Sequence, residues 1–268
     1  MNEPAPVRRL LKRLIARLGL GSFETRYRIE ALERMHYAYI LYQAAKLAAA
    51  LGQKRISAIE FGVAGGSGLR WMERHAEAIE RIFPVEIEIY GFDTGAGLPA
   101  PRDYRDLPYH WQHGFFAMDE AKLRASLKRA KLVIGDVAET WKTFAETHNP
   151  APVAAVAHDL DFYSSTAEGL KLLDIGEQYL MPRIFCYFDD TIGTDLELYS
   201  DFTGERLAIN EFNATRDKRK IAIPYHLRAR EGLGSWRHQI WIAHLFDHSR
   251  YNDFVSEHDQ QLPLRHQA

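Results

Sequence analysis

The chain has 268 residues, of which 46% are hydrophobic and 26% charged, and its formal net charge is -2 at pH 7. This composition is typical of a folded globular protein and argues against extensive disorder, while the small net charge gives no reason to expect nucleic acid as a partner. Cys186 is the only cysteine, which excludes an intrachain disulfide and a zinc site built from several thiolates. We therefore expect a protein that works in a reducing, cytoplasmic setting.

The first segment of the chain predicts a basic amphipathic helix between Val7 and Leu18, where five basic residues alternate with apolar ones at helical spacing. The arginines interrupt every apolar core that a signal peptide would need, and no stretch approaches the roughly 20 apolar residues of a membrane-spanning helix. Such a helix either packs on its own domain or on a dimer mate, or it binds a membrane surface or a partner.

After a second helical region at 23–51, strands and helices alternate along the chain. Strands are expected at 56–63, 85–93, 132–136, 153–159 and 183–190, and helices at 69–82, 123–128, 139–147 and 167–179. This alternation predicts a doubly wound, Rossmann-like sheet of mostly parallel strands. Two late runs, 221–227 and 239–246, predict a C-terminal antiparallel hairpin that brings the sheet to seven strands.

Three parts of the chain follow from this pattern. We assign them as an N-terminal helical extension at 1–52, an α/β domain at 53–250 and a C-terminal tail at 251–268. Inside the α/β domain, the segment 94–119 is too long and irregular for a simple connection, and long loops of this kind are usually functional. Its aromatic residues could line a ligand pocket, form a lid or pack on the protein: Tyr104, Tyr109, Trp111, Phe115 and Phe116.

The first predicted strand ends in a glycine-rich turn at 60–67. In a doubly wound sheet the ligand crevice lies beyond the carboxyl ends of the strands, where glycines let the backbone approach a ligand closely. Ala64 stands where the dinucleotide-binding fingerprint requires its second glycine, and no Gly-Lys-Ser/Thr follows as in a phosphate-binding Walker loop. The turn therefore indicates another ligand, or a purely structural role.

Aspartates end the next two strands. Asp93 follows Gly62 by about thirty residues, where its carboxylate can accept hydrogen bonds from both hydroxyls of a ribose. Asp136 could accept a hydrogen bond from an adenine amino group, or it could cap the following helix. With the glycine turn, Asp93 favours a ligand that contains adenosine.

More acids follow the fourth and fifth strands, in His158-Asp159-Leu160-Asp161 and Asp189-Asp190. Carboxylates that converge on one crevice repel one another unless a cation or a proton neutralises them. Because no thiolate is present, a hard ion such as Mg²⁺ is favoured over zinc, and it could bind and acidify vicinal hydroxyls of a substrate. Alternatively, Asp161 and Asp190 cap local structure and Asp189 alone faces the crevice.

Taken in order, these motifs resemble the macrocin-O-methyltransferase-like group of class I S-adenosylmethionine (SAM)-dependent methyltransferases, which act on sugar hydroxyls of natural products. The resemblance runs from Ile56 to Gly193. It rests on the segments 60–67, 90–99, 135–140, 159–166 and 189–190. The chain departs from the family at His158, at Leu160 in place of glycine, and at Pro182-Arg183 in place of Gly-Gly.

The resemblance implies the class I methyltransferase fold and a site for SAM. The residues implied to bind SAM are Glu60, Gly62, Gly65, Gly66, Ser67 and Asp93, with Asp136 near the adenine. The implied Mg²⁺ ligands are Asp159, Asp189 and Asp190. For the general base, His158 is favoured because the pKa of histidine lies near neutrality, and Asp159 is the competing candidate.

The sequence therefore predicts a SAM-dependent O-methyltransferase that acts on a hydroxyl of a sugar-like or natural-product acceptor. Two alternatives stay open. The first is a non-catalytic SAM-binding module that acts through a partner, with the helix at 7–18 as its contact. The second is a nucleotide-sugar or NAD-dependent enzyme, which the glycine spacing disfavours. Assembly as a homo-oligomer is compatible with either methyltransferase reading.

Overall fold

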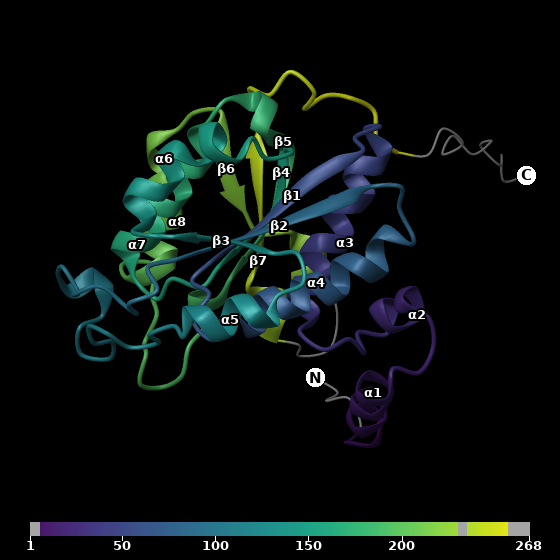
Figure 1. The fold of residues 1–268 in the computed structure, drawn as a ribbon, viewed down its shortest axis with the longest axis horizontal. Coiled ribbons are helices and arrows are strands. Elements are labelled where there is room, and N and C mark those ends of the chain that lie inside the picture. The colour runs from purple at the N-terminus through teal and green to yellow at the C-terminus, as the bar shows by residue number, and fades with distance from the viewer. Residues whose placement is uncertain (1–5, 230–234, 257–268) are drawn as a thin grey trace, which may run out of the picture.

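The computed structural model describes residues 6–229 and 235–256 and contains one seven-stranded sheet in the order β3-β2-β1-β4-β5-β7-β6 (Figure 1). The strands are β1 (Arg55–Phe61), β2 (Glu86–Asp93), β3 (Lys131–Ile134), β4 (Val153–His158), β5 (Leu180–Phe188), β6 (Arg219–Ala222) and β7 (Ile240–Leu245). The first five strands are parallel, and β7 is antiparallel to both β5 and β6. The prediction of a mostly parallel, doubly wound sheet with an antiparallel C-terminal pair is confirmed.

Helices cover both faces of the sheet. They are α1 (Pro6–Leu18), α2 (Phe23–Arg28), α3 (Met35–Ala50), α4 (Ser67–Glu80), α5 (Glu120–Ser126), α6 (Val137–His148), α7 (Tyr163–Gly169), α8 (Gly204–Thr215) and α9 (Tyr225–Arg228). Short 3-10 segments lie at Tyr104–Asp106, Leu170–Asp174, Glu177–Tyr179, Asp189–Thr191 and Ser235–His238. Helices α3 and α4 lie on one face and α6, α7 and α8 on the other (Figure 1). None of the helices within the described ranges is long and apolar enough to cross a membrane.

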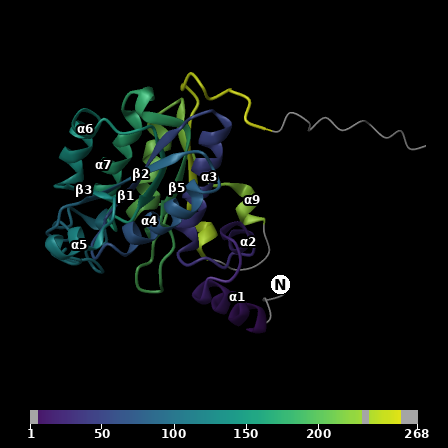
Figure 2. The same cartoon turned by 45° about the vertical axis from the view of Figure 1, so that its right-hand side comes forward.

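The N-terminal region is divided at Arg34, which adopts the left-handed conformation with φ 48° and caps α3. The expected single helical region at 23–51 is therefore two helices, α2 and α3. Helix α3 packs on β1, β4 and β5 and most of its residues are buried, so it belongs to the core of the α/β domain. Helix α1 lies away from the sheet (Figure 2), and its Leu10 and Leu18 are 60% and 64% exposed.

Two expectations about the second half of the sheet were wrong in their bounds. The helix expected at 167–179 begins at Tyr163 instead, because the buried carboxylate of Asp106 accepts hydrogen bonds from the backbone N–H and the hydroxyl of Ser164 and so holds the first turn. The strand expected at 221–227 ends at Ala222, and α9 follows it. Helix α8 had no counterpart among the expected elements. The predicted tail at 251–268 lies outside the described residues from position 257 onward.

The strand order brings the ends of four strands to one edge of the sheet. Strand β1 lies between β2 and β4, and β4 lies between β1 and β5, all with the same direction. Their last residues are Phe61, Asp93, His158 and Phe188. The connections that leave these strands therefore surround one crevice, as the sequence predicted.

Candidate functional site

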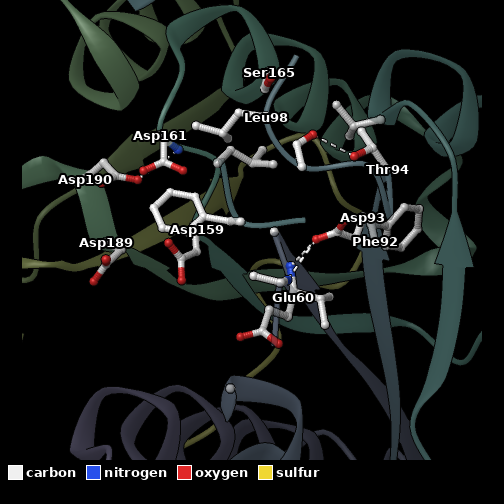
Figure 3. Close-up of a pocket in the computed structure, with 18 of the residues that line it drawn as sticks. Glu60, Phe92, Asp93, Thr94, Leu98, Asp159, Asp161, Ser165, Asp189 and Asp190 are labelled. Carbon is white, nitrogen blue, oxygen red and sulfur yellow. Dashed lines mark hydrogen bonds between the residues drawn. The ribbon is translucent and has the colours of Figure 1, made fainter. Parts of the chain in front are cut away.

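A cavity of about 430 Å³ lies at this edge of the sheet. Its walls come from the glycine turn after β1, from the segments after β2, β3, β4 and β5, and from two residues ahead of the sheet, Arg34 and Tyr37. Figure 3 shows Asp159, Asp161, Asp189 and Asp190 on one side of the cavity, and Asp93 and Thr94 on the other. The cavity therefore has two halves, each formed by a group of the residues singled out in the sequence.

The glycine turn is shaped by close approaches of the backbone. Gly62 has φ +81°, and a Cβ at this position would collide with the backbone carbonyl of Asp159. Gly66 has φ +70° and is the N-cap of α4. The place where a Cβ of Gly65 would lie is open space, and Gly65 lines the cavity, so a ligand can approach its backbone closely.

Asp93 holds this turn in place. One oxygen of its carboxylate accepts hydrogen bonds from the backbone N–H groups of Val63 and Ala64 at 2.8 and 2.9 Å, and the other accepts one from Gly95 at 2.7 Å. Asp93 also lines the cavity, and the oxygen that accepts from Gly95 retains capacity to accept a further hydrogen bond. Its ribose-binding role stays a prediction, joined to a structural role that the sequence did not indicate.

Asp136 combines the two roles that the sequence left open. Its Oδ1 accepts a hydrogen bond from the backbone N–H of Ala138 at 2.8 Å, which caps α6. The residue also lines the cavity, as do its chain neighbour Val137 and the apolar side chain of Phe92. A carboxylate together with apolar side chains suits a purine ring with an exocyclic amino group.

The opposite end of the cofactor half contains a buried acid and a cation. Glu60 is 2% exposed, its Oε1 accepts a hydrogen bond from the hydroxyl of Tyr37, and its Oε2 is buried without a partner in the described part of the chain. Burial raises the pKa of Glu60 to about 8. Arg34 lies 3.5 Å from the hydroxyl of Ser67, and among the described residues that line the cavity it is the only cationic one.

Arg34 and Tyr37 were not among the residues singled out in the sequence. They precede the glycine turn by some twenty-five residues in the chain and reach the cavity because α3 packs against β1. No signal in the sequence indicated Arg34, because the break between α2 and α3 was not predicted. Gly68 was also missed, although a Cβ there would collide with Glu60 and with the hydroxyl of Tyr37.

His158 does not lie on the cavity, so its assignment as the general base needs correction. Its side chain is 2% exposed and stacks between Phe188 and Phe61, with ring centroids 4.3 and 5.3 Å away. Burial lowers its pKa to about 3, which keeps the ring neutral. The physical reason is that successive side chains at the end of β4 point in opposite directions. The ring of His158 points to the face of the sheet where Phe61 and Phe188 lie, and Asp159 points toward the cavity.

Asp159, Asp161 and Asp190 share one electrostatic environment. Burial raises the pKa of each carboxyl, and repulsion from the neighbouring aspartates, Asp189 among them, raises it further. Four acids in one wall therefore favour a bound proton or a cation.

Two of these aspartates are also engaged in local structure. The carboxylate of Asp190 accepts hydrogen bonds from the hydroxyl of Tyr199 at 2.7 Å and from the backbone N–H of Asp161 at 2.9 Å. Asp189 accepts hydrogen bonds from the hydroxyl of Tyr187 and, at 3.1 Å, from the side chain of Gln239. The structural reading of Asp190 is thus supported, although Asp190 also lines the cavity.

The predicted metal ligands Asp159, Asp189 and Asp190 line one cavity, and their all-oxygen chemistry suits a hard divalent ion. Yet no group of three or more His, Cys, Asp or Glu side chains within residues 6–229 and 235–256 is arranged to hold a metal ion. The metal site therefore stays a prediction that requires a change of side-chain conformation.

The long loop contributes only part of its aromatic residues to the cavity. Trp111 and Phe116 line it, whereas Tyr104 and Tyr109 are 69% and 62% exposed. The loop is closed by backbone hydrogen bonds between Leu98 and the segment around Gly114, which bring Phe116 over the cavity. An acceptor pocket is therefore compatible with part of the predicted aromatic set.

No protein-family model and no curated protein matches the sequence. Several solved structures, however, are similar to this one. The calicheamicin methyltransferase CalS11 has 21% identity and a TM-score of 0.52, with 91% of this chain and 94% of that chain covered. The O-methyltransferase NovP has 15% identity and a TM-score of 0.50, with 78% and 79% covered. Together with the strand order, these similarities establish the class I methyltransferase fold.

Proposed function

We propose that this protein is a SAM-dependent O-methyltransferase that methylates a hydroxyl of a small sugar-like or natural-product acceptor. The observation that carries the proposal is the position of Asp93, which fixes the glycine turn and faces the same cavity. The fold is shared with CalS11 and NovP, which are methyltransferases. Because one fold can serve many functions, the argument depends on the site.

The cofactor half of the cavity matches the three parts of SAM. The apolar end near Asp136 suits the adenine, and Asp93 suits the ribose hydroxyls. At the other end, Arg34 with Ser67 suits the carboxylate of the methionine part, and Glu60 suits its ammonium group. Opposite charges at the two sides of a zwitterion give both affinity and orientation.

The chemical step needs an acceptor oxygen in line with the S–CH₃ bond. The oxygen attacks the methyl carbon, the new C–O bond forms as the S–C bond breaks, and S-adenosylhomocysteine leaves. The proton of the hydroxyl passes to a base, for which we propose the carboxylate of Asp159. It lies on the cavity, and burial and the surrounding acids raise its pKa, so its ionised form is a stronger base than an ordinary carboxylate.

A divalent ion is a separable part of the proposal. Asp159, Asp189 and Asp190 would hold it, after rotation of side chains that are now hydrogen-bonded elsewhere. When bound, such an ion would neutralise the acidic wall and lower the pKa of the acceptor hydroxyl. Loss of methyl transfer on addition of a chelator, with recovery on addition of Mg²⁺, would support this part, whereas indifference to both would remove it.

The activity is tested by incubating the purified protein with methyl-labelled SAM and a panel of sugars and hydroxylated natural products. We expect transfer of label to at least one acceptor and, by the Asp159→Asn variant, transfer that is at least about 100-fold slower. If SAM binds but no acceptor in a broad panel is methylated, the non-catalytic SAM-binding module becomes the better account. In that case, loss of a partner on deletion of residues 7–18 would identify the contact helix.

A further inference from the structure

A second cavity, of about 380 Å³, lies beside the first and has the opposite charge. It is lined by Ile192, Arg206, Arg228, Ser235 and His238. None of these residues, which are those of the lining that the structure describes, carries a carboxylate. The first cavity thus has a wall of carboxylates, and the second has a wall of guanidinium groups.

The two cavities are neighbours because chain segments pass from one to the other. Arg206 follows Glu205, whose carboxylate accepts a hydrogen bond from the backbone N–H of Asp190 at 2.9 Å. His238 precedes Gln239, whose side chain donates hydrogen bonds to Asp189. A ligand group in the second cavity would therefore lie close to the acceptor half of the first, because the chain neighbours of Arg206 and His238 contact Asp190 and Asp189.

Of the two arginines that line the second cavity, Arg228 is the one without a carboxylate partner among the described residues. It donates hydrogen bonds to the ring Nδ1 of His238 at 2.6 Å and to the carbonyl oxygen of the same residue at 3.2 Å. Among the described residues, its buried Nε has no hydrogen-bond partner and no carboxylate forms an ion pair with it. Burial and repulsion from Arg206 lower the pKa of Arg228, as expected where a counter-charge is lacking.

The other lining groups add donors. Arg206 directs its Nε and one terminal nitrogen to the carboxylate of Asp201, which leaves its second terminal nitrogen available. Because guanidinium groups only donate, the contact with Arg228 makes the Nδ1 of His238 an acceptor, so the proton of its neutral ring is on Nε2. The carboxylate of Asp201 thus pairs with only one of the two guanidinium groups, and Ser235 adds a hydroxyl to the lining of the cavity.

We propose that this second cavity binds a phosphate group carried by the acceptor, with Arg228 and Arg206 as its principal contacts. Phosphate oxygens accept several hydrogen bonds at once, and guanidinium groups match their geometry. An acceptor with a phosphate group at this site would extend its hydroxyl toward Asp159 in the first cavity. The acceptor part of this inference rests on the proposed methyltransferase function, whereas phosphate binding itself does not.

The first experiment measures the binding of inorganic pyrophosphate to the full chain by calorimetry at low salt, in the absence of SAM. We expect the Arg228→Gln variant to bind at least tenfold more weakly than the unaltered protein. The control is Arg216→Gln, which also removes an arginine; Arg216 pairs with Asp174 and does not line the second cavity. Arg228→Lys keeps the charge, and circular dichroism of each variant reports whether it is folded.

The second experiment asks whether the phosphate belongs to the acceptor, by comparing glucose 1-phosphate with glucose. We expect Arg228→Gln to weaken binding of the phosphorylated sugar by at least tenfold and to leave that of glucose unchanged. Equal pyrophosphate binding by the unaltered protein, Arg228→Gln and Arg216→Gln would overturn the phosphate site. Pyrophosphate binding without any preference for glucose 1-phosphate over glucose would overturn its link to the acceptor. Neither result depends on SAM binding, which is measured separately.

Discussion

The backbones of Gly62 and Asp159, two residues that line the cavity, approach each other closely where the turn after β1 meets the segment after β4. A Cβ on Gly62 would collide with the carbonyl group of Asp159, and Gly62 has φ +81°. The backbone N–H of Asp159 also donates a hydrogen bond to the carbonyl oxygen of Phe61 at 2.9 Å. The cofactor turn and the proposed base are thus fixed to each other by the main chain.

Substitution of Gly62 by alanine tests this contact. We expect Gly62→Ala to reduce the free energy of unfolding by at least about 3 kcal/mol, because a strained φ and a backbone collision add. The control is Gly52→Ala, since Gly52 has φ +70° but open space around the position of its Cβ, and it should cost about 1 kcal/mol. Equal losses for the two variants in chemical denaturation would contradict the close approach.

Arg34 is expected to recognise the carboxylate of SAM. We predict that Arg34→Met weakens the binding of SAM by about tenfold or more, because a charge-assisted hydrogen bond is lost. The binding of 5′-methylthioadenosine, which lacks the amino-acid part, should not change. Arg81→Met, an exposed arginine at the end of α4, serves as the matched control. Equal weakening of both ligands by Arg34→Met would show that Arg34 supports the fold and not the carboxylate.

Glu60 predicts a pH dependence of SAM binding. Burial raises the pKa of Glu60 to about 8, so in the free protein the side chain is protonated below that pH. An ammonium group beside it favours the carboxylate, so binding releases a proton, and the affinity should rise with pH toward about 8 and level off above it. Calorimetry in buffers of different ionisation enthalpy measures this proton, which Glu60→Gln should abolish. An unchanged proton release in Glu60→Gln would refute the assignment.

The placement of His158 and Asp159 predicts opposite effects of substitution on methyl transfer. His158→Phe should retain activity, because the ring packs between Phe61 and Phe188 and does not reach the cavity. Asp159→Asn should lose at least about 100-fold in kcat, as expected for a lost general base. If the His158→Phe variant is folded but inactive, His158 and not Asp159 would be the better candidate for the general base.

The fold and the cofactor half of the site could be largely predicted from the sequence, because both depend on local patterns. The strand and helix periods gave the alternation of the sheet, and Gly62 and Asp93 follow strands whose ends meet at one edge. The insertion of β7 between β5 and β6 could not be predicted, since the pairing of distant strands is not encoded in either run alone. The start of α7 could not be predicted either, because it depends on a hydrogen bond from Ser164 to Asp106, which is distant in the sequence.

The acceptor half shows where sequence reasoning ends. His158 and Asp159 are adjacent, and alternation indicates that they face opposite sides, but only the surrounding structure shows which of them faces the cavity. Arg34 and Tyr199 reach the site from segments far from the motifs. Side chains delivered by tertiary packing leave no local signal in the chain.

The most direct test of the central claim is calorimetric titration of the purified protein with SAM. The proposed site predicts one molecule bound per chain with a micromolar Kd, strong weakening by Asp93→Asn, and no change by Asp103→Asn, whose exposed carboxylate pairs with Arg105 outside the cavity. Absence of binding by both SAM and S-adenosylhomocysteine, or equal affinity for SAM in the Asp93→Asn variant, would contradict the account.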